Sequence, residues 1–185
     1  MLSWQGFTLR AVGGLLRDLR TACHISPSFD PSSTPVDQHP ASCEFVAIWD
    51  TGATNSVITQ QVIDACGLVA TGMAQSQSAH GTKVVETFLV NIGLINEVQI
   101  LSVPVTKAEL GPDTQVLIGM DIITLGDFVV TNKDGITVFS FRTPSQVCVD
   151  FVEQHRAEQL QESFKHGGST KHRKERHKTY GKNKK

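Results

Sequence analysis

The sequence predicts an all-β domain over residues 43–144 of a chain of 185 residues. Most apolar segments in this region are short, and several alternate with polar residues as half-buried strands do. Two pairs of such segments flank Gly-containing turns, at 79–81 and 132–135, which is typical of β-hairpins. Only two segments, 59–66 and 120–125, have the end signals of helices, and both are short. The expected fold is therefore β-sheet with two short helices.

The first predicted strand, residues 44–49, brings one carboxylate, Asp50, into a turn of small residues. A carboxylate at the end of a buried strand destabilises the fold unless another group pairs with it. Thr51 supplies a hydroxyl that can reach backbone groups, and Gly52 lets a second backbone approach without a Cβ between them. This turn is the first candidate for a functional site.

The elements after this turn are predicted from local signals. The first helix has Thr59 as its N-cap and Gly67 just past its end. The arms of the first hairpin are 68–78 and 82–92, around the tip Ala79-His80-Gly81. Residues 98–105 alternate between apolar and polar, and Pro104 places this strand at an edge.

The last part of the predicted domain begins with a fully apolar inner strand, residues 116–118. Gly119 follows it directly, and the second short helix comes next. The second hairpin pairs 127–131 with 136–141 around the turn Asn132-Lys133-Asp134-Gly135.

Two of these segments together resemble the retroviral-type aspartic proteases (retropepsins), in their cellular or bacterial branch. Asp50-Thr51-Gly52-Ala53 is similar to the active-site loop of that family, and Val116-Leu117-Ile118-Gly119-Met120-Asp121-Ile122-Ile123 is similar to its second signature, an apolar strand, a Gly and a short helix. The two signatures occur in the family's order and at a plausible spacing, and the resemblance covers residues 43–141. It implies a closed β-barrel, one lobe of a two-lobed pepsin-like enzyme, with Ile118 and Gly119 packed under the loop.

The resemblance implies an aspartic endopeptidase, in which two carboxylates share a proton and activate a water molecule. This chain has a single Asp-Thr-Gly, so a homodimer with its active site on the two-fold axis is expected. By resemblance Asp50 is the acid and base, Thr51 hydrogen-bonds across the axis, and Gly52 makes room for that approach. Ala53 stands where pepsin-like relatives often carry Ser or Thr, so we expect activity to extend toward neutral pH.

The same resemblance makes the tip Ala79-His80-Gly81 a flap over a polypeptide substrate, although it has one glycine instead of a glycine-rich tip. An exposed His without a role is the alternative for His80. Asp121 is interpreted as a helix-start carboxylate favoured by the helix dipole, not as a third catalytic acid. No cofactor or metal is expected, because the histidine spacings match no common zinc site.

The two ends of the chain lie outside the resemblance. Residues 1–42 are predicted to be an N-terminal extension and a Pro/Ser-rich linker. Residues 1–25 fit an amphipathic helix broken by glycines, either a targeting peptide or a dispensable extension. Residues 145–164 are predicted to form an exposed helix, and 165–185 a basic tail that is too charged to bury a core.

Charge and cysteine usage set the expected partners and compartment. Residues 163–185 hold nine Lys/Arg and one acidic residue, whereas residues 1–162 hold eight Lys/Arg and seventeen acidic residues. The tail could contact nucleic acid or an acidic protein, and a solvated tail is the alternative. The four scattered cysteines predict free thiols in a cytoplasmic protein. No apolar run approaches the roughly 18 residues of a membrane span, so no membrane partner is expected.

A function of another class stays open at this point. The chain could be a catalytically idle dimerisation or peptide-binding module that keeps the barrel, with the basic tail serving nucleic acid or acidic partners. The retention of Asp50, Thr51 and Gly52 together argues against this alternative, because a binding module has no need for a pair of like charges.

Overall fold

The computed structural model describes residues 4–78 and 81–167. The chain divides into two compact units, Met1–Gln146 and Val147–Lys185. Ten strands lie in the first unit, in two sheets, among the residues described there. The prediction of an all-β domain is confirmed.

The larger sheet has seven strands in the order β2-β3-β8-β4-β7-β6-β5. A further pairing joins β2, at one end of this order, to β6, the last strand but one at the other end, so that six of the strands form a ring and β5 lies outside it. This ring corresponds to the barrel that the sequence predicts. The strands are β2 (Leu19–Pro27), β3 (Cys43–Trp49), β4 (Val57–Ile58), β5 (Gly72–Ser78), β6 (Gly81–Gly93), β7 (Gln99–Lys107) and β8 (Val116–Ile118).

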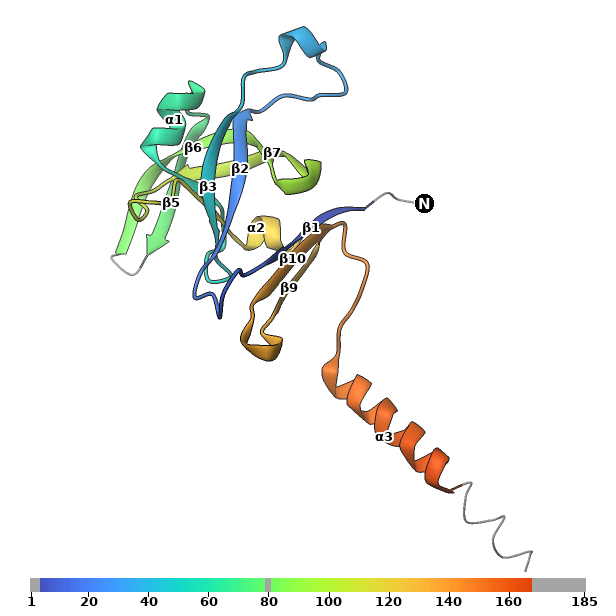
Figure 1. Ribbon diagram of the computed structural model, residues 1–185. Helices are drawn as coiled ribbons and strands as arrows, with labels where there is room; N and C mark the ends of the chain where they lie inside the picture. Colours follow the sequence, from blue (N-terminus) through green and yellow to red (C-terminus); the bar gives the residue numbers. More distant parts are fainter. Residues whose placement is uncertain (1–3, 79–80, 168–185) are drawn as a thin grey trace, which may run out of the picture. The chain divides into compact units, whose positions relative to one another are not determined.

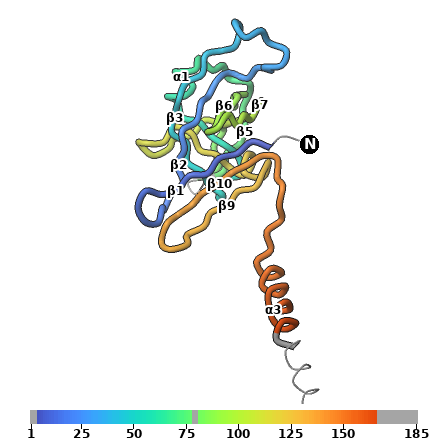
Figure 2. Tube along the Cα trace, turned by 45° about the vertical axis from the view of Figure 1, so that its right-hand side comes forward, coloured from blue at the N-terminus to red at the C-terminus, as the bar shows by residue number. Residues whose placement is uncertain are grey.

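The smaller sheet has three strands in the order β1-β10-β9, which come from the two ends of the first unit. Its strands are β1 (Gln5–Arg10), β9 (Asp127–Thr131) and β10 (Val138–Thr143). Figures 1 and 2 both show β1, in dark blue, running alongside the orange β10. The hairpin of β9 and β10 was predicted, and its pairing with β1 was not.

The expectation of an amphipathic helix in residues 1–25 is wrong, because these residues supply β1 and β2. In β2 the side chains alternate: Thr21, Cys23 and Ile25 are buried, whereas the intervening residues face solvent. β2 pairs with β3 along the register from Leu19↔Trp49 to Ile25↔Cys43. Residues 5–27 are thus part of both sheets and not an extension that precedes them. Residues 28–42, the predicted linker, contain one 3-10 turn, η1 (Val36–Gln38), and no strand.

Aromatic side chains join the two sheets around Trp49, the last residue of β3. Its ring lies 5.0 Å from Phe141 and 5.2 Å from Phe139, both on β10. Phe7 of β1 lies 6.0 Å from Trp49 in an edge-on arrangement, which is favourable for aromatic pairs. The indole N–H of Trp49 donates to the Thr21 hydroxyl at 3.0 Å, so the polar edge of the ring is also satisfied. The end of β3 is therefore held firmly where Asp50 begins.

The short helices lie close to the predicted positions. They are α1 (Gln60–Cys66) and α2 (Met120–Ile123), and the 3-10 turns η2 (Ile95–Glu97) and η3 (Lys133–Gly135) accompany them in this unit. Thr59 is at the N-cap of α1, but its hydroxyl is buried without a hydrogen-bond partner. Gly67 ends the helix in the left-handed conformation, with φ 58°.

The second unit contains α3 (Phe151–Gly167), which begins later than the predicted helix at 145. The side chains described on it, through residue 165, are exposed. Residues 168–185, most of the predicted basic tail, lie outside the described part of the chain. In the parts of the chain that the structure does describe, no helix has the length and apolar character needed to cross a membrane.

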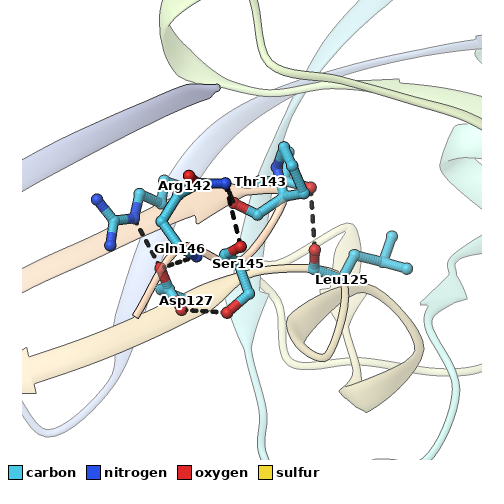
Figure 3. A network of polar contacts seen from close by, with 7 residues as sticks. Leu125, Asp127, Arg142, Thr143, Ser145 and Gln146 are labelled. Atoms are coloured by element: carbon cyan, nitrogen blue, oxygen red, sulfur yellow. Dashed lines mark hydrogen bonds and ion pairs between the residues drawn. The ribbon is translucent and has the colours of Figure 1, made fainter. Parts of the chain in front are cut away.

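A polar network fixes the chain after β10 to the start of β9 (Figure 3). The Asp127 carboxylate accepts hydrogen bonds from the Ser145 hydroxyl, from the Gln146 N–H at 2.8 Å and from Arg142 Nε at 2.7 Å. The hydroxyl of Thr143 donates to the Leu125 carbonyl at 3.1 Å. The hydrogen bonds from Ser145, Gln146 and Arg142 lower the pKa of Asp127 to about 2.

Phe7→Ala tests whether β1 is part of the core. The Phe7 side chain is 5% exposed, so we expect a loss of about 3–5 kcal/mol in the free energy of unfolding, as for other buried Phe→Ala changes. Urea denaturation measures this loss. Val12→Ala is the control, because Val12 is fully exposed and should change stability by less than about 0.5 kcal/mol. Equal stability of the Phe7 variant would mean that β1 is a dispensable extension.

The Asp127 network makes stability depend on pH. Because the folded-state pKa of about 2 lies below the ordinary value of 3.8, the contribution of Asp127 is present above about pH 4 and is lost as the pH falls toward 2. Asp127→Asn should lower the urea midpoint near pH 7, and the difference from the wild type should shrink as the solution is acidified. Asp37→Asn, at an exposed turn position, is the control. A pH-independent difference would contradict the network.

Candidate active site

Asp50 lies where three strands meet. β8 pairs in parallel with β3 (Trp49↔Ile118) and antiparallel with β4 (Val57↔Leu117), so it lies between them. Residues 50–56, here named the Asp50 loop, join β3 to β4 and must therefore cross the end of β8. The Asp50 N–H donates to the Ile118 carbonyl at 2.9 Å and so extends the ladder between β3 and β8 by one bond.

The Asp50 carboxylate is held by the turn that follows it. Its Oδ1 accepts the N–H of Gly52 at 2.8 Å, and the Asp50 carbonyl accepts the N–H of Ala53 at 3.2 Å. A Cβ at residue 52 would lie 3.1 Å from Oδ1, so glycine is the residue that leaves this carboxylate unobstructed. Asp50 is half-buried, whereas Thr51 and Gly52 are exposed. One side of the loop thus faces the protein and the other faces solvent.

Gly119 lies directly against the inner side of the Asp50 loop. A Cβ built on Gly119 would lie 2.7 Å from the carbonyl carbon of Asn55 and 3.0 Å from the Ala53 carbonyl oxygen. No side chain fits there, because real Cβ contacts are longer than this. The next residue, Met120, donates its N–H to the Ala53 carbonyl at 2.8 Å. The structure therefore brings the two sequence signatures together, with Ile118 fully buried beside them.

Reasoning from the sequence missed Ser56 and the contact that Asp121 makes with it. The buried Ser56 and the half-buried Asp121 hydrogen-bond to each other across 65 residues of sequence. The interpretation of Asp121 as a helix-start carboxylate is incomplete: it accepts the N–H of Ile122 at 3.0 Å, but its other contacts are to Ser56. Its place between apolar residues of the second signature was the only signal available.

The predicted hairpin after α1 is formed by β5 and β6, in the register from Gly72↔Thr87 to Ser78↔Gly81. Gly81 has φ 108°, a conformation that only glycine adopts readily, which explains a glycine at this turn. Ala79 and His80, the other two residues of the expected flap tip, lie outside the described residues. The structure therefore places the arms of the hairpin and leaves the role of its tip untested.

Two of the cysteines are poor nucleophiles, and no metal cluster is found among the described residues. All four cysteines are free. Burial raises the pKa of both Cys23 and Cys66 to about 12, so these thiols hold their protons at neutral pH and are poor nucleophiles. No group of three or more His, Cys, Asp and Glu in the described residues is placed to hold a metal ion.

Gly119→Ala tests the close approach under the Asp50 loop. The added Cβ would overlap backbone atoms that cannot move aside freely, so we expect a loss of about 1–3 kcal/mol in the free energy of unfolding. Gly111→Ala is a matched control, because a Cβ there meets nothing within 4 Å. Urea denaturation of both variants measures the effect. If both variants were as stable as the wild type, the Asp50 loop would not lie against residue 119.

Comparison with known proteins finds a family match over part of the chain. Residues 41–124, which include both signatures, match the family described as "gag-polyprotein putative aspartyl protease". A solved structure, a retropepsin-like aspartic protease from Rickettsia conorii, is similar over 77% of this chain and 98% of its own, at 11% identity and a TM-score of 0.42. No curated protein sequence matches the chain. The resemblance of this region to the retropepsin-like aspartyl proteases, seen in the sequence, is confirmed by the family match over residues 41–124.

Proposed function

We propose that this chain is an aspartic endopeptidase that acts as a homodimer, with one Asp50 carboxylate from each copy. The observation that carries the proposal is the position of Asp50. Its carboxylate is fixed by the Gly52 N–H, and it stands on a loop whose outer residues, Thr51 and Gly52, are exposed. A rigid, partly exposed carboxylate is what activation of a water molecule requires.

In the hydrogen bonds of the described residues, Asp121 is the one carboxylate besides Asp50 that contacts the Asp50 loop. Asp121 lies on the inner side of the loop, and both its oxygens already accept hydrogen bonds from Ser56 or Ile122. A second copy of Asp50, brought up by a two-fold axis that passes by Thr51 and Gly52, supplies the second carboxylate of the reaction. By the family resemblance, the Thr51 hydroxyl then bonds across the axis.

The two carboxylates share one proton, because two like charges so close together cannot both ionise. The ionised carboxylate takes a proton from the attacking water, whose oxygen adds to the peptide carbonyl carbon. The protonated carboxylate gives its proton to the carbonyl oxygen. Transfer of a proton to the amide nitrogen then allows the carbon–nitrogen bond to break, and both products leave.

The substrate class supported best is an extended polypeptide. β5 lies outside the ring of strands, so its outer edge is unpaired within the described residues. An edge strand can add a strand from a peptide by backbone hydrogen bonds. We place the substrate between the hairpin of β5 and β6 and the Asp50 loop, with the tip Ala79-His80-Gly81 as the flap.

Two further expectations stay predictions. The free thiols fit a reducing compartment such as the cytoplasm. Binding of nucleic acid by the basic tail rests on charge alone.

The alternative of an idle dimerisation or peptide-binding module would use Asp50 only as a structural carboxylate. In that case the amide variant would disturb the turn at Gly52 and would have no activity to lose. The same substitution therefore separates the two functions.

Asp50→Asn should abolish peptide hydrolysis and leave the fold intact. The amide is nearly isosteric but cannot accept the proton of the water, so we expect the rate to fall by about 10²–10⁴-fold. Hydrolysis of an unfolded polypeptide, with and without pepstatin, measures the rate. Asp37→Asn is the control, since Asp37 is exposed and lies in the 3-10 turn Val36–Gln38.

Sedimentation of the same proteins tests the shared site. The Asp50→Asn dimer should be as tight as the wild type or tighter near pH 7, because the repulsion between two carboxylates is removed. A strictly monomeric wild type that still cleaved peptides would contradict the homodimer. An Asp50→Asn variant with wild-type activity would place the chemistry elsewhere.

A further inference from the structure

The Asp121 carboxylate makes contacts that only a pure acceptor can make. Its Oδ2 accepts the Ser56 N–H at 2.9 Å. Its Oδ1 accepts the Ser56 hydroxyl at 2.8 Å and the Ile122 N–H at 3.0 Å. The Ile122 donor belongs to α2, and the Ser56 donor directly precedes β4, so neither N–H can turn freely to suit a different side chain.

Ser56 is equally constrained. It is completely buried, and its hydroxyl accepts the Gly119 N–H at 3.0 Å while it donates to Asp121. The direction of every hydrogen bond in this group is thus determined. A neutral amide at position 121 would turn an NH₂ group toward at least one N–H or O–H donor, which leaves buried donors unsatisfied.

These contacts belong to a longer row of hydrogen bonds between the Asp50 loop and the second signature. Six bonds join residues 50–56 to residues 118–121. Three are the backbone bonds from Asp50 to Ile118, from Met120 to Ala53 and from Asp121 to Thr54. The other three all involve the Ser56 N–H or hydroxyl. The side chains of Ser56 and Asp121 therefore fix the far end of the same loop that begins with Asp50.

We propose that Asp121 is a positioning residue, which through Ser56 fixes the Asp50 loop in the geometry that catalysis requires. The proposal rests on the proposed function for its kinetic consequence, but the placement of the loop does not depend on activity. Asp121 is half-buried and both its oxygens already accept hydrogen bonds from Ser56 or Ile122, so we assign it no direct part in the reaction. Its effect must pass through the backbone of residues 53–56 to the Gly52 N–H and the Asp50 carboxylate.

This role predicts a particular kinetic signature. Small displacements of a reacting group lower the rate strongly, by about 10²-fold for 1 Å, while substrate binding at surfaces remote from the loop is untouched. Asp121→Asn should therefore lower kcat by about 10²-fold and leave KM unchanged. A residue with a merely structural role would lower the fraction of folded enzyme and leave the kcat of that fraction unchanged.

The test compares four proteins: wild type, Asp121→Asn, Ser56→Ala and the double variant. If Asp121 acts through Ser56, the double variant should lose no more activity per folded, active dimer than Asp121→Asn alone, since the two losses are then not additive. Ser56→Ala keeps the Ser56 backbone N–H, so its loss of kcat should be smaller than that of Asp121→Asn. If Asp121→Asn does not fold, the kcat of Ser56→Ala tests the positioning role instead. Asp64→Asn is a matched control, an exposed carboxylate on α1 bound to Gln60 at 2.8 Å, and should keep its kcat.

Amide hydrogen exchange gives a readout that needs no activity. In Asp121→Asn the amides of Ser56 and Gly119 should exchange faster, with protection in β6 and β7 unchanged. If the wild type does not cleave peptides but these amides lose protection, the proposed function fails and the placement of the loop by Asp121 stands. If the wild type is active and folded Asp121→Asn keeps its kcat, or raises KM alone, the positioning role is wrong.

Discussion

The approach of Gly119 to the Asp50 loop is the contact on which the rest of the site depends. β8 lies between β3 and β4, so the chain that joins β3 to β4 has to cross the end of β8. At that crossing the two backbones come so close that a Cβ on residue 119 would lie 2.7 Å from a backbone carbon of Asn55. A glycine at this point lets the backbone hydrogen bonds form, and those bonds fix the carboxylate of Asp50.

The smaller sheet also helps to fix Asp50, because it holds β3, the strand that precedes the Asp50 loop. Trp49 is packed among the rings of Phe7, Phe139 and Phe141, which come from the first and last strands of the domain. The residue after it is Asp50. A close-packed core transmits strain, because its side chains have little room to move aside. The position of the Asp50 carboxylate therefore depends on strands at both ends of the unit. Residues 5–27 therefore belong to the domain, although they precede the family match, which begins at residue 41.

The two carboxylates near the crossing have different tasks because they face opposite sides of one loop. Asp121 faces inward, where donors from Ser56 and Ile122 occupy both its oxygens. Asp50 stands beside the exposed residues Thr51 and Gly52 and is held by one N–H at Oδ1. An inward carboxylate with hydrogen bonds to both its oxygens stabilises the loop, whereas an outward one is available to another molecule. In the proposed enzyme, symmetry supplies the second outward carboxylate.

The sequence by itself determined the local features of this protein: the hairpins of β5 with β6 and of β9 with β10, the short helices, and Asp50 with its second signature. Alternation, turn residues and end signals act over a few residues, so they are visible without a fold. The strands β1 and β2 were not predicted, because their apolar residues also fit a helical period and only pairing with β10 and β3 decides between the two. The contact of Ser56 with Asp121 was also decided by the tertiary structure. It joins residues 65 apart in the sequence, and a hydrogen bond across that separation leaves no local pattern.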